Sequence, residues 1–531
     1  MKRVALVLLL FVLIVPLFAD NGLKVIPLES DVYSAIDALY VLEGKALPST
    51  TRPWTADEAA LYLSKVSRET SPELYDIVLN AVEVKPRLGV DEVFGMTFGL
   101  KLSATGYAHT EKGFSYPFNG MTNYLFSTKA ETPPVRVSWE AWAGEHFYSY
   151  VWYQYKLFPD GNKFSSYSFN FDLPNLTPEG FTSDMDQREP SRAFALAGGK
   201  NWSLEVGRDR LLMGTGTTGS LILSDTFPYH NLLRFSLYGS RYKYSFIMSF
   251  LPHMSRDEEH GLQESSGLLF YMTHRFECTF LSDILYAAIN ESIMYKDDGG
   301  FADMRYINPV MYFHNYFIST HANSIVDLEL SYALAKGWNA YFQFALDQFS
   351  TPWEVADGDD VDPLAFGALI GLRHVSSAGK GILTLNLEAS YTMPYLYLRE
   401  TQIAEEEHIQ SLTDPGLGYI GLYRGRRFFV GYTFGNDVLV FDFKGTYEVP
   451  SNLKLSAEFF FMLDGEKNVD SLFDKDDGAF APSGDYGIFW YAELYGKKKI
   501  SDRAAIYSQY DLIYSAGIWD NQFVLGIEIE F

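Results

Sequence analysis

The sequence predicts an all-β transmembrane β-barrel of roughly 16 to 18 antiparallel strands, preceded by a small N-terminal α-helical module. From Phe94 to the C-terminus, apolar and polar residues alternate with a period of two, which is typical of strands with one apolar and one polar face. Short turns alternate with long, acidic, glycine-containing loops between these segments. The chain is also rich in aromatic residues and glycine, with 37 Tyr, 41 Phe, 9 Trp and 42 Gly among 531 residues. Bacterial outer-membrane barrels combine these three features.

Residues 1–19 are predicted to be a secretory signal peptide, because two basic residues precede an apolar run from Val4 to Phe18 and the small residue Ala19 follows it. No cysteine lies near the expected cleavage point, which argues against a lipid anchor. Cys278 is the only cysteine, so an exported chain of this size carries no internal disulfide. No later run of about 18 apolar residues could form a spanning helix. The mature chain therefore either is soluble or crosses a membrane as strands.

Residues 20–90 are predicted to form a periplasmic module of two or three helices. The first helix begins after an N-cap at Ser30 and ends at Gly44. A second begins at Thr55, which opens a capping box, and a third has Pro72 in its first turn. A module of this size is too small to be stable alone, so we expect it to pack against the barrel.

Residues 91–531 are predicted to form the barrel. In the first strand, Phe94 and Met96 share one face and Thr97 lies on the other. A soluble sandwich would alternate in the same way, but strict alternation of short and long connections favours a barrel with periplasmic turns and external loops. The last strand ends at Phe531, and a C-terminal aromatic residue resembles the signal that the outer-membrane barrel assembly machinery recognises. That machinery and outer-membrane lipid are therefore expected partners.

If the apolar faces contact lipid, the charged residues on the opposite faces line the lumen, where water can solvate them. A barrel of this width has an interior that its own strand side chains cannot fill. The lumen is expected to be polar and net acidic, with these residues pointing inward: Asp327, Glu329, Asp347, Glu388, Asp442, Glu458, Glu528, Glu530, Lys101, Lys444 and Lys454.

The stretch GRDRLLMGTGTTGSLILSD contains a G-x-G-x-x-G pattern at Gly214, Gly216 and Gly219. A dinucleotide-binding loop with this pattern needs a helix directly after the glycines, and the residues that follow here have strand character instead. The glycines are better explained as a tight turn with positive φ, or as a bulge at the end of a strand.

Two blocks of sequence resemble the capsule assembly Wzi family. The first is GRDRLLMGTGTTGSLILSDTFPY, which is similar to that family's glycine-arginine strand, glycine-rich turn and serine-leucine strand. It departs from the family pattern at Met213 and Thr215, where tryptophan and proline are usual. The second block begins at THRFECTF. Its matched positions are His274, Arg275, Glu291, Asn308 and Pro309.

The resemblance implies a lectin-like barrel that holds capsular or exopolysaccharide at the outer membrane, with the helical module at the periplasmic end. The residues expected to form a lumen network or to bind polysaccharide are Arg208, Arg210, His274, Arg275 and Glu291. The charged members could form a network within the lumen. Such a network could pin a plug or loop, which is the favoured role, or it could contact the ligand directly.

Several functions are not expected. A net charge of −25 disfavours nucleic acid as a partner, because binding it requires Lys and Arg to neutralise phosphates. The chain lacks the H-E-x-x-H and G-x-S-x-G motifs, so we expect no enzyme, and no cofactor or specific metal site. The acidic stretches DGDDVD and DKDDG do not match EF-hand spacing and could at most bind divalent cations weakly.

Three alternatives stay open. The acidic lumen is also compatible with a cation-favouring diffusion porin. The helical module resembles a single partial S-layer homology repeat, a unit that binds cell-wall polymers, although a periplasmic cap on the barrel is the favoured interpretation. Trp353, Trp490 and Trp519 could stack on sugar rings, but tryptophans near strand ends are more often part of the aromatic girdle at the membrane interface.

Overall fold

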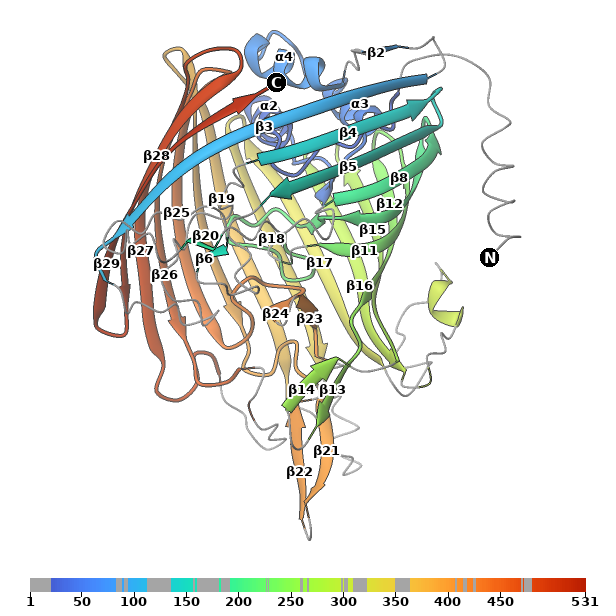
Figure 1. The fold of residues 1–531 in the computed structure, drawn as a ribbon, viewed down its shortest axis with the longest axis vertical. Coiled ribbons are helices and arrows are strands. Elements are labelled where there is room, and N and C mark those ends of the chain that lie inside the picture. Colours follow the sequence, from blue (N-terminus) through green and yellow to red (C-terminus); the bar gives the residue numbers. More distant parts are fainter. Residues whose placement is uncertain are drawn as a thin grey trace.

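A computed structural model of the chain shows a wide barrel with helices at one end (Figure 1). It describes residues 21–82, 88–89, 94–111, 135–155, 158–159, 181–182, 192–225, 227, 229–257, 261–264, 267–297, 299, 304–308, 322–348, 363–405, 408–413, 418–423, 426–468, 471 and 480–531. The predicted signal peptide, residues 1–19, lies outside the described residues. No helix in the described part of the chain is long and apolar enough to span a membrane.

Within the described residues, 18 antiparallel strands form a closed barrel, which confirms the predicted fold class. Each strand pairs with its neighbours along the chain, and the last strand pairs with the first to close the ring. The barrel strands are β3 (Phe94–His109), β4 (Val135–Ala143), β5 (Phe147–Tyr155), β8 (Arg192–Gly199), β9 (Trp202–Asp209), β11 (His230–Tyr238), β12 (Tyr242–Leu251), β15 (Leu268–Phe280), β16 (Leu285–Asp297), β17 (Ala322–Ala335), β18 (Trp338–Gln348), β19 (Ala365–Ala378), β20 (Gly381–Thr392), β25 (Val438–Val449), β26 (Leu453–Asp464), β27 (Gly487–Lys499), β28 (Ala504–Ser515) and β29 (Ile518–Glu530).

The described chain also contains short strands outside the barrel ring. The pair β1 (Thr51–Arg52) and β10 (Leu212–Met213) forms a two-stranded sheet. The other short elements are β2 (Leu88–Gly89), β6 (Phe158–Pro159), β7 (Phe181–Thr182), β13 (Met254–Asp257), β14 (Gly261–Glu264), β21 (Glu400–Glu405), β22 (His408–Thr413), β23 (Ile420–Tyr423), β24 (Arg426–Phe429) and the 3₁₀ helix η3 (Met304–Ile307). The hairpins β13–β14 and β21–β22 extend from the end of the barrel opposite the helices (Figure 1).

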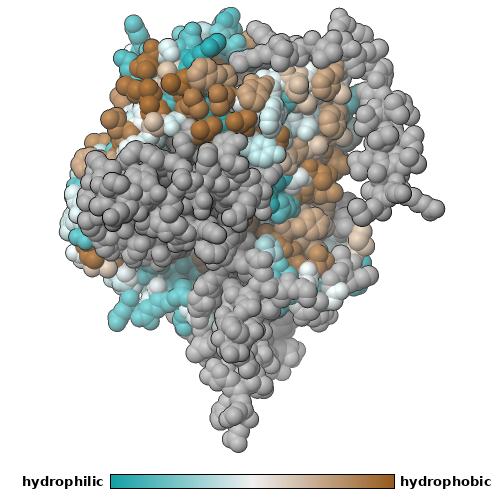
Figure 2. Space-filling model, viewed as in Figure 1, coloured by the Kyte–Doolittle hydropathy of each residue, from teal (hydrophilic) through white to brown (hydrophobic). Residues whose placement is uncertain are grey.

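The two faces of the wall differ as the alternation predicts. On β29, Leu525 is 69% exposed and the adjacent Val524 is 4% exposed, because one side chain points out of the barrel and the other into it. Phe94 and Met96 of β3 are also exposed on the outer face. Hydrophobic residues cover much of the outer wall that is visible between the hydrophilic ends (Figure 2). A wall with this apolar exterior is stable in lipid rather than in water, consistent with an outer-membrane location.

Long and short connections lie at opposite ends of the barrel, with one exception to the predicted strict alternation. Strands β28 and β29 are joined by only Ala516 and Gly517, at the end where the other connections are long. Outer-membrane barrels place short turns in the periplasm and long loops outside. By this rule the end with the short turns, which also carries the helices, is the periplasmic end.

The helical module consists of α2 (Asp31–Glu43), α3 (Ala56–Leu63) and α4 (Pro72–Val82). The predicted first helix is confirmed, since Ser30 caps its N-terminus and Gly44 ends it in the left-handed conformation. Thr55 caps α3 by accepting a hydrogen bond from the backbone N–H of Glu58. The Glu58 side chain does not return to the cap, as a full capping box requires, because it accepts hydrogen bonds from Tyr62 and Lys243.

The module packs onto the turns at the periplasmic end of the barrel. The backbone N–H of Gly337, in the turn between β17 and β18, donates to the Val41 carbonyl at 2.7 Å. Ala46 donates in the same way to Asp283, in the turn between β15 and β16, at 2.7 Å. Lys65 forms an ion pair with the Asp283 carboxylate at 2.9 Å.

The C-terminal residue Phe531 continues the hydrogen-bond ladder that closes the barrel. Its backbone N–H donates to the Leu100 carbonyl of β3 at 2.8 Å, and its side chain is exposed on the apolar outer face. The predicted terminal signal therefore lies at the junction between the first and last strands.

Candidate functional site

The connection between α2 and α3 runs into the barrel, and we call residues 44–55 the strap. The Ser49 hydroxyl and the Thr50 backbone N–H both donate to the Glu277 carboxylate of β15, at 2.9 and 3.1 Å. The wall in turn donates to strap carbonyls: Lys243 of β12 reaches Thr51 at 2.9 Å. The strap is thus fixed to the barrel wall by its backbone and its side chains together.

Arg275 of β15 is the centre of a fully buried charged cluster behind the strap. Its guanidinium forms ion pairs with Asp327 and Glu329 of β17 and donates to the Thr50 hydroxyl of the strap at 2.7 Å. Tyr286 of β16 accepts a hydrogen bond from the same guanidinium at 3.2 Å. A buried arginine needs carboxylates and hydrogen-bond acceptors around it, and the strap supplies one of these acceptors through Thr50.

The segment that carries the G-x-G-x-x-G pattern also turns into the lumen, and we call residues 210–225 the inner loop. Gly214 and Gly219 both have φ of 136°, a conformation that side-chain-bearing residues rarely adopt. At Gly216 a Cβ would lie 2.1 Å from the Gly219 carbonyl oxygen. The glycines therefore form a tight turn inside the barrel, held to the strap because the Gly214 N–H donates to the Thr50 carbonyl at 3.2 Å.

The tip of the inner loop is bound to the opposite wall. The backbone N–H groups of Thr217 and Thr218 donate to the Glu388 carboxylate of β20 at 2.7 and 2.9 Å. The Leu221 N–H donates to the Gln343 side chain of β18 at 2.9 Å. The inner loop therefore spans the interior of the barrel, between the strap and the wall formed by β18 and β20.

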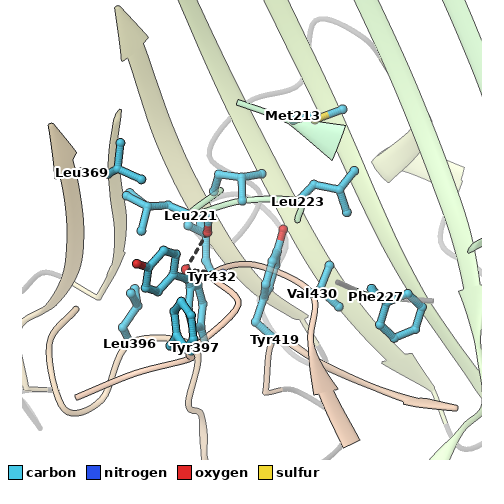
Figure 3. Close-up of a cluster of buried hydrophobic side chains, with 14 of the residues drawn as sticks. Met213, Leu221, Leu223, Phe227, Leu369, Leu396, Tyr397, Tyr419, Val430 and Tyr432 are labelled. Atoms are coloured by element: carbon cyan, nitrogen blue, oxygen red, sulfur yellow. Dashed lines mark hydrogen bonds between the residues drawn. The ribbon is translucent and has the colours of Figure 1, made fainter. Parts of the chain in front are cut away.

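A third inward segment, residues 393–398, 418–423 and 426–437, covers the inner loop from the external side, and we call it the outer plug. An apolar core forms between the two segments, and Tyr397 of the outer plug donates a hydrogen bond to the Leu221 carbonyl at 2.6 Å (Figure 3). Its labelled members are Met213, Leu221, Leu223, Phe227, Leu369, Leu396, Tyr397, Tyr419, Val430 and Tyr432. The lumen at this level therefore contains a packed hydrophobic core.

Arginine and aromatic side chains gather on the inner face of β4, β5 and β8. The Arg136 guanidinium lies 3.6 Å from the Trp152 ring centre, and Arg192 lies 5.4 Å from the Tyr150 ring centre. Arg192 is also paired with Asp209. Among the described residues, no hydrogen-bond acceptor faces the Nε of Arg136. We call Arg136, Tyr150, Trp152 and Arg192 the arginine–aromatic cluster.

Glu29, just before α2, connects the N-terminal segment to the inner loop through an ion pair with Arg210. Arg210 also donates to the Asp225 carbonyl at 2.8 Å. Burial raises the pKa of Glu29, but Arg210 and Arg192 outweigh it and hold that pKa below its ordinary value. Glu29 is therefore ionised at neutral pH and stabilises the base of the inner loop.

Two of the five predicted site residues are in the lumen network. Arg275 is its centre, and Arg210 links the inner loop to the N-terminal segment, but the two belong to separate groups of ion pairs. The prediction that Arg208 contributes to a charge network in the lumen is wrong. The next residue, Asp209, is buried and pairs with Arg192, whereas Arg208 points outward and donates to Asn231 at 2.9 Å.

Glu291 and His274 also face outward, so placing them in a lumen network is wrong. Glu291 lies between Asn290 and Ser292, whose side chains point into the barrel. Glu291 and His274 are register partners on β16 and β15. Both are fully buried, because η3 covers this part of the outer wall and the His274 Nε2 lies 3.1 Å from the Tyr306 carbonyl oxygen. Asn308 directly follows η3, and Pro309 lies outside the described residues.

Other predicted features are placed as follows. Trp490 and Trp519 lie together on the outer face near the external ends of their strands, with ring centres 5.0 Å apart, as girdle residues do. Trp353, DGDDVD and DKDDG lie outside the described residues. Among the side chains that the structure does describe, no group of three or more His, Cys, Asp or Glu could hold a metal ion.

The sequence pattern does not reveal the arginine–aromatic cluster, and the reason is specific. In FYSYVWYQY, aromatic residues occupy both faces of the strand, so alternation alone cannot tell inward Tyr150 and Trp152 from the outward-facing rings. Arg136 is polar and alternates with Val135 and Val137, which is a signal of its inward direction. Its position on the Trp152 ring depends on the register between β4 and β5.

Comparison with known proteins shows likeness in fold alone. Wzi of Escherichia coli, an outer membrane protein involved in group 1 capsule assembly that is described as a carbohydrate-binding β-barrel, is similar with a TM-score of 0.62 and 13% identity over 96% of this chain and 99% of that chain. OprD of Pseudomonas aeruginosa (TM-score 0.39, 10% identity, 82% of this chain and 95% of that chain) and an anion-selective porin from Comamonas acidovorans (0.34, 11%, 82% and 100%) are less similar. No protein-family model and no curated protein matches the sequence.

Proposed function

We propose that this outer-membrane barrel binds surface polysaccharide, such as capsule or exopolysaccharide, without catalysing a reaction. The observation that carries the proposal is the filled lumen. The strap, the inner loop and the outer plug meet inside the barrel and share a hydrophobic core, as Tyr397 and Leu221 illustrate. A fixed, packed interior gives a binding protein a rigid surface at its external end.

The same observation argues against a diffusion porin. An open acidic lumen would select cations through free carboxylates. Here Glu277 binds the strap, Glu329 pairs with Arg275 and Glu388 binds the inner loop. Because these carboxylates hold the strap and the inner loop in place, they are not available to line a water-filled path.

The arginine–aromatic cluster has the chemistry that carbohydrate recognition uses. Tyr and Trp rings pack against the C–H faces of sugars, and guanidinium groups donate several hydrogen bonds to hydroxyl or carboxylate oxygens. Arg136 and Arg192 lie at the external ends of β4 and β8. Trp152 and Arg192 are buried, whereas Arg136 and Tyr150 are partly exposed. We place the polysaccharide at this end, against Arg136 and Tyr150.

The likeness to Wzi supports this proposal as an analogy. That protein is described as carbohydrate-binding, but at 13% identity the likeness concerns the fold, and similar folds carry different functions.

The experiment measures both candidate activities on one refolded sample. Retention is measured on immobilised polysaccharide purified from the surface of the cells that produce the protein, and conductance is measured in planar bilayers. We expect retention and no steady conductance. The Arg136→Ala and Tyr150→Ala variants should lose retention at least about tenfold, since a stacked or charge-assisted contact is worth about 1.4 kcal/mol or more.

Arg208→Ala is the matched control, because Arg208 is on an adjoining part of the wall but faces outward. It should retain polysaccharide as the wild type does. Steady conductance without retention on polysaccharide would contradict the proposal and would indicate a diffusion porin. Retention that is equal in all variants would move the binding site away from the cluster.

A further inference from the structure

The outer face of the barrel contains a groove of about 1130 Å³, which begins near the periplasmic ends of β20 and β25 and runs obliquely to the middle of β29 and the external half of β3. It crosses β25 to β29 and reaches β20 and β3, and its lining is mostly apolar. Large side chains border it, among them Leu455, Leu494 and Phe523, which are all strongly exposed. Because these side chains point out of the barrel, the groove opens toward lipid and not toward the lumen.

The groove exists because small residues align across neighbouring strands. Gly445 of β25 pairs in register with Ala457 of β26, and Gly496 of β27 pairs with Ser508 of β28. Gly106 of β3 continues the row beside β29. None of the three glycines needs positive φ, and an added Cβ would come no closer than 3.3 Å to a neighbour. Backbone geometry therefore does not require glycine at these positions, and its effect is to leave space.

Basic residues border the periplasmic end of this groove. Lys498 follows Gly496 on the same outward face of β27 and is exposed at the membrane edge, between Leu453 and Ile506 in register. Lys380, in the turn before β20, and Arg503, in the turn before β28, are exposed at the same end. Asp502 and Glu530 are also exposed at this end, so the basic character is greatest at Lys498, which projects from the outward face of β27.

We propose that this groove is a binding site for an anionic phospholipid of the periplasmic leaflet. The acyl chains lie in the apolar groove, and the headgroup phosphate is bound by Lys498, with Arg503 in the turn that follows β27. Cationic side chains at a membrane edge attract anionic headgroups by about 1 kcal/mol each. The site lies on the outer wall, away from the arginine–aromatic cluster, so it goes beyond the proposed polysaccharide binding.

The shape favours lipid over a second copy of the barrel. In a two-fold symmetric dimer the same patch would face itself. Two concave surfaces would then face each other and leave the space between them unfilled. A flexible acyl chain can follow a curved, shallow channel between Leu455 and Leu494. The basic edge also matches a phosphate better than it matches another copy of the same basic edge.

The experiment uses the full-length mature protein in detergent and counts bound lipids by native mass spectrometry. The probes are phosphatidylglycerol and phosphatidylcholine with identical acyl chains. We expect one phosphatidylglycerol to be retained in preference to phosphatidylcholine. The Lys498→Ala/Arg503→Ala variant should lose this preference by about 30-fold, which corresponds to about 1 kcal/mol for each charge.

Gly496→Leu tests the groove separately from the charge. It fills the channel without altering the lysines, so both lipids should be lost together. Lys200→Ala, in the turn between β8 and β9, removes an exposed charge at the same end of the barrel but away from the groove, and it should behave as wild type. Heat-modifiable migration in gels confirms that each variant is folded, and Gly445→Leu replaces Gly496→Leu if the latter fails that check.

Equal retention of the two lipids by the wild type would overturn the proposal. So would lipid binding that neither the charge variant nor the groove variant reduces. Neither outcome would affect the polysaccharide experiment, because the arginine–aromatic cluster that it tests lies on the inner wall.

Discussion

The Tyr397 hydroxyl donates a 2.6 Å hydrogen bond to the Leu221 carbonyl oxygen, and this contact joins the outer plug to the inner loop (Figure 3). The same hydroxyl accepts a hydrogen bond from the Tyr432 backbone N–H at 3.1 Å. A single side chain thus satisfies two buried backbone groups on two segments. This contact acts together with the apolar core that the two segments share.

Tyr397→Phe should weaken the contact between the outer plug and the inner loop without unfolding the barrel. The variant leaves a buried carbonyl and a buried N–H without their partner, which costs about 1–3 kcal/mol for each group. We expect faster hydrogen exchange at the amides near Leu221 and Tyr432, with strand amides unchanged. Tyr514→Phe, on the outer face, is the control and should show wild-type exchange at both places. Unchanged exchange in Tyr397→Phe would mean that the apolar core alone holds the two segments together.

Arg275→Ala should be among the most destabilising single changes in the lumen wall. It leaves Asp327 and Glu329 buried without their cation and removes the donor to Thr50. Breaking a buried pair in this way costs about 3–5 kcal/mol. Equilibrium unfolding in denaturant measures the loss, and Arg208→Ala should change the free energy of unfolding by less than about 1 kcal/mol because its side chain is exposed to the exterior. Equal losses in the two variants would contradict the central role of Arg275.

Gly219→Ala should strain the inner loop. The φ of 136° disfavours any side chain, and the added Cβ would lie 2.5 Å from the Thr433 hydroxyl oxygen. A residue held in such a conformation costs about 1–3 kcal/mol, visible as a lower midpoint of thermal unfolding. Gly106→Ala, where φ is ordinary and the nearest atom is 3.9 Å away, is the control. If both variants had the same midpoint of thermal unfolding as the wild type, the glycine turn of the inner loop would have to rearrange without cost.

The link between Glu29 and Arg210 should weaken on acidification. Burial raises the pKa of Glu29, but the charge of Arg210 outweighs burial and holds that pKa below its ordinary value of 4.5. A carboxyl with a lowered folded-state pKa stabilises the fold above 4.5 and loses that contribution as pH falls through the folded value. Limited proteolysis of residues 21–30 should therefore speed up below pH 4.5 in the wild type.

Glu29→Gln should be cleaved faster at neutral pH and should show little further change on acidification. Added salt should reduce the difference between the two proteins, since the Glu29 side chain is 45% exposed. The exposed Glu69→Gln serves as the control. An identical pH dependence in wild type and Glu29→Gln would assign the effect to another carboxylate.

Alternation in the sequence is sufficient to predict the barrel and the faces of its strands. Lipid excludes charge, so one face of each strand has to be apolar, and residues such as Glu388 and Asp442 can be assigned to the lumen from the alternation alone. The helix limits at Ser30 and Gly44 follow from capping chemistry in the same way. These features depend on nearest neighbours along the chain, which is why the sequence displays them.

Alternation along β15 and β16 conflicts with the site residues that the family resemblance implies. His274 and Arg275 are adjacent on one strand, so only one of them can face the lumen. What the sequence could not show is that η3 folds over the outer wall, where it buries His274 and Glu291 and so permits polar residues on a face that otherwise contacts lipid. The strap and the outer plug have no periodicity, and their positions depend on contacts between distant parts of the chain.

The position of the strap has a consequence for biogenesis. The strap lies inside a closed ring of 18 strands. It must therefore be in place before the barrel closes, or enter afterwards through the periplasmic end. The strap precedes β3 in the chain, and β3 is one of the two strands that meet at the final junction beside Phe531. The order of the chain thus links insertion of the strap to closure of the barrel. An N-terminal tag too bulky to enter the barrel with the strap would give a closed barrel whose lumen lacks it.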